Sequence, residues 1–122
     1  MIVISDEVQN DLRVLRDSLK GFRVGGLKLP PAASALSLDL SGEHFVMLAQ
    51  YLVEQWGAIH KHKVKYSREI YPPGLVREKM RLSTIEDLGL EVWVDVMWTG
   101  EYFEVLDVEF INSDTGEIVE VG

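Results

Sequence analysis

The sequence predicts an α+β fold in which two N-terminal helices pack on one face of a three- to five-stranded antiparallel sheet. Apolar residues recur with a helical period in the first half of the chain and alternate, as in strands, in the second half. Short turn sequences join the last strands, which predicts a C-terminal β-meander. The 122 residues, 47% of them hydrophobic, fit one domain over 1–122.

The first helix is expected over residues 6–20. Ser5 suits the N-cap position, and the two acidic residues after it complement the positive end of the helix dipole. Gly21 lies where helices commonly end in a glycine. One apolar stripe follows the helical spacing and consists of Val8, Leu12, Leu15 and Leu19.

The second helix is expected over residues 42–56, with Ser41 as N-cap and Gly57 as the end. Residues 22–40 contain one Gly-Gly pair and one Pro-Pro pair, which interrupt regular structure, and are interpreted as a packed connector. A wide apolar face comprises Phe45, Leu48, Ala49, Leu52, Val53 and Trp56.

Residues 60–66 and 76–82 alternate basic with other side chains and predict two strands, each with one basic face. The basic residues are Lys61, Lys63, Lys65, Arg77, Lys79 and Arg81. Ser83 and Glu86 then form a capping-box pattern that predicts a single helical turn, ended by Gly89.

Residues 90–98 predict the clearest strand, with valines on one face and Glu91, Trp93, Asp95 and Met97 on the other. In the return strand the apolar residues change phase, so a bulge near residues 105–106 is needed to restore one apolar face. A turn around Gly116 then leads to a third strand at 117–121.

Charge is sorted along the chain. Residues 82–122 contain eleven acidic residues and no Lys, Arg or His, whereas residues 60–81 contain seven Lys/Arg and two Glu. With the net charge of −8, this pattern predicts an acidic meander face that docks a basic protein partner. The expected partner-binding residues are Glu91, Trp93, Asp95, Met97, Tyr102, Glu104, Asp107 and Glu109. If the basic strands lie beside the acidic ones, however, the two signs neutralise each other across the sheet.

Two other functions compete with protein docking. The first alternative is nucleic-acid contact through Lys61, Lys63, Lys65, Arg77, Lys79 and Arg81. The second is a small metal-dependent enzyme using His60 and His62, whose side chains would share one side of a strand. Two histidines do not make a metal site, so no metal ligand set, catalytic residue or cofactor is assigned.

The leading hypothesis is therefore a small, acidic, non-enzymatic binding, inhibitor or adaptor module. The chain has no Cys, its first residues lack the pattern of a signal peptide, and no apolar run approaches the length of a membrane span. These features predict a cytoplasmic protein without a membrane partner. A homodimer through the same face is also considered, if basic strands of one copy meet acidic strands of the other.

Overall fold

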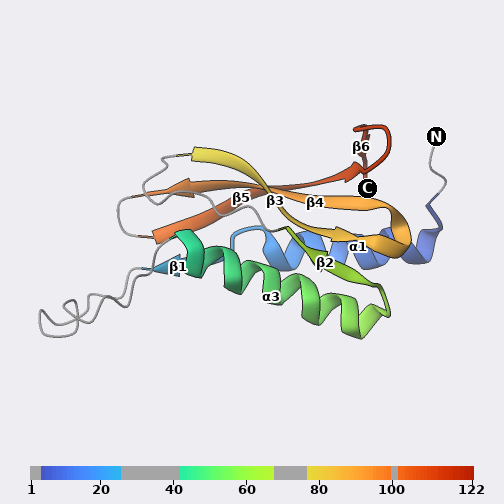
Figure 1. The fold of residues 1–122 in the computed structure, drawn as a ribbon, viewed down its shortest axis with the longest axis horizontal. Helices are drawn as coiled ribbons and strands as arrows, with labels where there is room; N and C mark the ends of the chain where they lie inside the picture. The colour runs from blue at the N-terminus through green and yellow to red at the C-terminus, as the bar shows by residue number, and fades with distance from the viewer. Residues whose placement is uncertain (1–3, 26–41, 68–76, 100–101) are drawn as a thin grey trace, which may run out of the picture.

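The computed structural model describes residues 4–25, 42–67, 77–99 and 102–122. It confirms the α+β class, with the helices N-terminal and the antiparallel strands C-terminal (Figure 1). The elements are α1 (Asp6–Leu19), β1 (Arg23–Gly25), α3 (Gly42–His60), β2 (Val64–Tyr66), β3 (Arg77–Ile85), the 3-10 turn η1 (Glu86–Leu88), β4 (Leu90–Trp98), β5 (Tyr102–Asn112) and β6 (Ile118–Val119).

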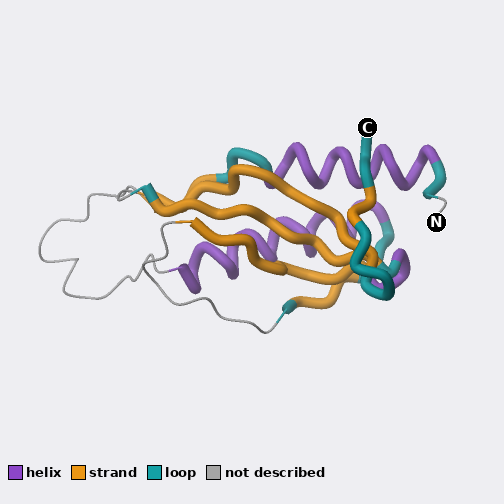
Figure 2. Tube along the Cα trace, turned by 90° about the horizontal axis from the view of Figure 1, so that it is seen from above, coloured by secondary structure: helices purple, strands orange, loops and turns teal. Residues whose placement is uncertain are grey.

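The sheet has the strand order β1-β5-β4-β3-β2, and the short β6 also pairs with β5. Because β4 occupies one edge of β5, strands β1 and β6 share the other edge. In the side view, α1 and α3 both lie on the same side of the sheet (Figure 1), and the view from above shows α3 behind the strands with α1 along the edge of the sheet (Figure 2). Among the described residues, helices therefore cover one face of the sheet only.

Helix α1 follows the sequence prediction. The Ser5 hydroxyl accepts a hydrogen bond from the Val8 backbone N–H at 3.3 Å, and Gly21 adopts a positive φ of 83° after the helix. The stripe residues Leu12, Leu15 and Leu19 are fully buried. The predicted N-cap of the second helix, Ser41, lies outside the described residues.

Helix α3 does not end at Gly57, as the sequence suggested, but continues to His60. A Cβ at Gly57 would lie 2.7 Å from Val64 Cγ2 and 2.9 Å from the His62 carbonyl oxygen. The glycine therefore permits the chain to fold back closely against the helix. Consequently the predicted strand at 60–66 is reduced to β2, Val64–Tyr66.

Two bulges keep the apolar side chains on one face. Between β4 and β5 the register shifts after Asp95, so that Leu106 is the extra residue, which confirms the predicted bulge. A second bulge, in β3, was not predicted and makes Leu82 the extra residue. As a result Ser83 lies buried on β3 instead of capping a helix, while Gly89 ends η1 at a φ of 63° as expected.

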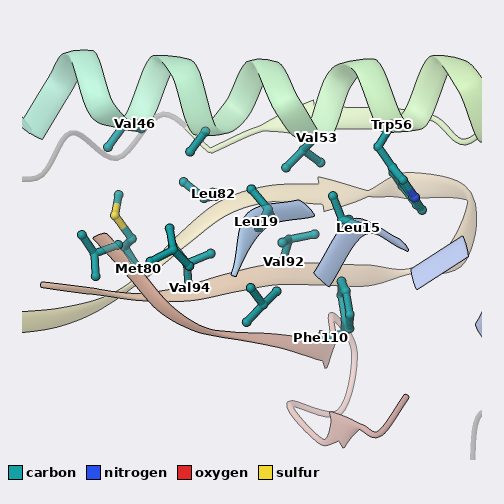
Figure 3. Close-up of a cluster of buried hydrophobic side chains, with 14 of the residues drawn as sticks. Leu15, Leu19, Val46, Val53, Trp56, Met80, Leu82, Val92, Val94 and Phe110 are labelled. Carbon is teal, nitrogen blue, oxygen red and sulfur yellow. The ribbon is translucent and has the colours of Figure 1, made fainter. Parts of the chain in front are cut away.

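The core fills the space between the helices and the sheet (Figure 3). Val46, Val53 and Trp56 point from α3 toward the strands, where Val92, Val94 and Phe110 meet them from the sheet. Their side chains are at most 8% exposed, as expected for the densely packed interior of a small domain. Among the residues that the structure describes, no helix is long and apolar enough to cross a membrane.

Candidate functional site

The sheet face that points away from the helices carries the predicted docking residues. Directly paired residues in neighbouring antiparallel strands place their side chains on the same face. Trp93 on β4 pairs with Arg81 on β3 and with Glu109 on β5. Pairing and alternation place the rest of the set on this face as well: Glu91, Asp95, Met97, Tyr102, Glu104 and Asp107. We call it the open face, because no described helix or strand covers it.

The charges of the open face are largely paired with one another. The ion pairs are Arg77 Nη2–Asp95 Oδ2 at 2.8 Å, Lys79 Nζ–Glu109 Oε1 at 3.2 Å, Arg81 Nη1–Glu91 Oε2 at 3.2 Å and Arg23 Nε–Glu104 Oε1 at 2.9 Å. Four of the acidic residues expected to attract a basic partner thus have a cation from a neighbouring part of the sheet. For these four carboxylates, the basic and acidic side chains neutralise each other across the sheet. The open face therefore carries mixed charge.

Trp93 is the central aromatic side chain of the open face. It is half-buried, and its indole Nε1 donates a hydrogen bond to Glu91 Oε1 at 3.0 Å. The other oxygen of the same carboxylate accepts from Arg81, so the indole belongs to an ordered polar network. Met97 is also half-buried, while Asp95 between them is buried. The centre of the face therefore combines partly exposed apolar surface with fixed ion pairs.

A hollow of 720 Å³ lies beside this centre, where β2, β3 and β4 meet. Two cations and two carboxylates line it together with small polar side chains; the main residues are Lys65, Arg81, Glu86, Glu91, Thr84 and Ser113. Because both signs are present, the lining does not select a strongly charged small molecule. It provides a polar depression next to Trp93 instead.

The basic residues do not form two free ladders. Arg77, Lys79 and Arg81 on β3 are held by carboxylates of β4 and β5. Lys61, with a φ of 60°, and Lys63 precede β2, so neither continues a strand ladder with Lys65. The geometry thus supplies no observation that favours nucleic-acid contact over protein docking.

His60 and His62 share one partner, Asp11, but neither histidine lies on a strand. His60 is the last residue of α3, and His62 lies in the connection to β2. Asp11 of α1 contacts both, through His60 Nδ1 at 3.0 Å and His62 Nε2 at 3.2 Å. Asp87 of η1 contacts His62 Nδ1 at 2.8 Å. No signal in the sequence singles out these two aspartates, which are 51 and 25 positions from His62.

This histidine cluster does not carry the metal-enzyme hypothesis further. In the described part of the chain, no group of three or more His, Cys, Asp or Glu side chains is arranged to hold a metal ion. The imidazole of His62 already contacts a carboxylate with each of its nitrogens and stacks on Trp56, with 5.2 Å between ring centroids.

A second exposed apolar surface lies on the outer side of α3. It comprises Met47, Leu48, Tyr51 and Ile59, of which Ile59 is 73% exposed and Tyr51 54% exposed. Leu48 was expected in the buried face of this helix and is instead 37% exposed. The outer side of α3 is therefore a second candidate surface for a protein contact, beside the open face.

Comparison of the chain with protein-family models, with curated protein sequences and with solved structures finds no match.

Proposed function

We propose that this chain is a non-enzymatic binding or adaptor module that docks a protein partner through the open face. The observation that supports the proposal is a sheet face that no described helix or strand covers, with a partly exposed Trp at its centre. Tryptophan is enriched among the residues that dominate binding energy at protein interfaces. The ion pairs around Trp93 are suited to form a polar rim that excludes water from such a contact.

The expected charge of the partner follows from the net charge of the whole chain more than from the charges of the open face. The net charge of −8 favours the approach of a basic partner over long range. Locally, four carboxylates already have cations, so the partner gains less from local charge than the sequence suggested. We therefore assign orientation and approach to charge, and the anchoring contact to Trp93 and Met97.

The test is affinity capture with the full chain and two variants as bait, from a lysate of cells that express the protein. Trp93→Ala removes the central aromatic of the open face. Tyr51→Ala removes a more exposed aromatic from the outer side of α3 and serves as the control for loss of a surface aromatic elsewhere. For a protein captured by the wild type, we expect Trp93→Ala to weaken binding at least tenfold, which corresponds to about 1.4 kcal/mol.

Circular dichroism and thermal melting must first show that both variants are folded. Unchanged binding by folded Trp93→Ala contradicts docking through the open face. Loss of binding by Tyr51→Ala alone assigns the interface to the outer side of α3. Lower salt should speed association of a basic partner with the wild type, because steering between exposed charges is screened by ions.

A further inference from the structure

His62 is held between two carboxylates that belong to different parts of the chain. Its Nε2 lies 3.2 Å from Asp11 Oδ2 on α1, and its Nδ1 lies 2.8 Å from Asp87 Oδ2 on η1. The side chain is only 10% exposed, and its ring stacks on Trp56 of α3 at an interplanar angle of 19°. Three elements thus meet at one imidazole.

The protonation state of the ring decides how many of these contacts are hydrogen bonds. A carboxylate only accepts hydrogen bonds when ionised, and a neutral imidazole carries one N–H. Only the imidazolium form donates to Asp11 and Asp87 together. In the neutral form one of the two contacts brings a nitrogen lone pair against a carboxylate oxygen, which is repulsive.

The surroundings of His62 favour the charged form. Burial by itself lowers the pKa of His62, but the hydrogen bonds to Asp87 and Asp11 and the charges of both carboxylates outweigh burial and raise it above the ordinary 6.5. His60 on α3 is a further titratable group at the site, and its Nδ1 also contacts Asp11 at 3.0 Å. From the connection itself, Lys63 contributes its backbone N–H, which donates to Asp87 Oδ1 at 3.0 Å.

We propose that His62 is a proton-dependent clasp, which joins α1, the end of α3 and η1 when the imidazole is protonated and loosens when it loses its proton. A clasp of this kind is a pH-sensitive device, because histidine changes charge near neutral pH. Since the folded-state pKa lies above the unfolded value, the stabilisation is fully present below about pH 6.5 and is lost as pH rises through the folded-state pKa. The proposal is independent of the docking face.

The first experiment is an NMR titration of the ¹⁵N-labelled full chain, which reports the protons on each ring nitrogen. We expect both nitrogens of His62 to carry protons at about pH 6.5, and the ring to titrate above that value. A ring that is already neutral there, with a single proton, overturns the proposal.

The second experiment uses Asp87→Asn as a matched variant. The asparagine Oδ1 can still accept from Lys63 N–H, while its Nδ2 can donate to Nδ1 of a neutral His62 whose Nε2–H donates to Asp11. The neutral ring is then fully satisfied, so we expect the pKa of His62 to fall. His60→Gln leaves both His62 contacts in place and should retain a raised pKa.

Thermal melting from about pH 5.5 to about pH 8.5 then provides the readout of stability. We expect the melting temperature of the wild type and His60→Gln to fall as pH rises through the pKa of His62, and the profile of Asp87→Asn to be flatter. A folded Asp87→Asn protein that keeps the wild-type pH profile contradicts the clasp. A wild-type profile that does not fall across the His62 titration contradicts it as well.

Discussion

The two faces of the sheet are built from the same strands but differ in how they meet their neighbours. On β5, Phe110 points to the helices and is 1% exposed, while Glu109 beside it points to the open face and pairs with Lys79. The covered face consists of apolar side chains that two helices bury. The open face consists of ion pairs around a half-buried Trp93.

This difference shows where stability and recognition are expected to reside. Apolar burial contributes roughly 25 cal/mol per Å² removed from water, whereas exposed ion pairs contribute little. The covered face should therefore dominate the free energy of unfolding, whereas the proposed binding role rests on the open face. Substitutions on the two faces should separate these two properties.

The largest effect is expected on the covered face. Phe110→Ala removes a large side chain from the contact between β5 and the helices, and should lower the free energy of unfolding by about 3–5 kcal/mol. Urea denaturation followed by circular dichroism measures this loss. A change below about 1 kcal/mol would contradict this expectation, because it would mean that the covered face is loosely packed.

An intermediate effect is expected where the helix layer touches β2. In an exposed helix, Gly→Ala usually adds about 1 kcal/mol of stability. At Gly57 the new Cβ would meet the His62 carbonyl oxygen at 2.9 Å, and we expect Gly57→Ala to destabilise the protein by about 1–3 kcal/mol instead. The same denaturation experiment shows whether Gly57→Ala lowers or raises the free energy of unfolding. A stabilised variant would show that β2 can move away from α3.

The smallest effect is expected on the open face. Glu109→Gln removes the charge that pairs with Lys79, whose side chain is 59% exposed. Because solvent screens such a pair, the free energy of unfolding should change by no more than about 0.5 kcal/mol. Phe110→Ala, one residue along the same strand, provides the direct comparison. A decrease of more than about 2 kcal/mol in the free energy of unfolding of Glu109→Gln would contradict the small effect expected on the open face.

Most of the fold could be predicted because local patterns determine it. The apolar stripe of α1, the alternation along β4 and the bulge at Leu106 all follow from the spacing of side chains within one element. β1 was missed, since its three residues gain their strand conformation only by pairing with β5. The end of α3 was misplaced, since the reason for Gly57 is a contact with Val64 and not a turn.

The site could be predicted only in part. Alternation placed the docking residues on one face, but the order of strands decided that their charges are paired. The contact of His62 with Asp11 joins residues 51 positions apart, and periodicity carries no information about it. Contacts between side chains of different elements depend on how those elements pack, and the spacing of residues along one chain does not determine them.

The outer edge of β5 has a further consequence for the behaviour of the protein at high concentration. Strands β1 and β6 leave the middle of this edge without a strand partner among the described residues. There the Val108 backbone N–H donates to the side chain of Asp107 at 2.9 Å. A strand from another molecule would have to displace a charged acceptor to use that donor. We therefore expect Asp107 to disfavour edge-to-edge pairing of two sheets at this position.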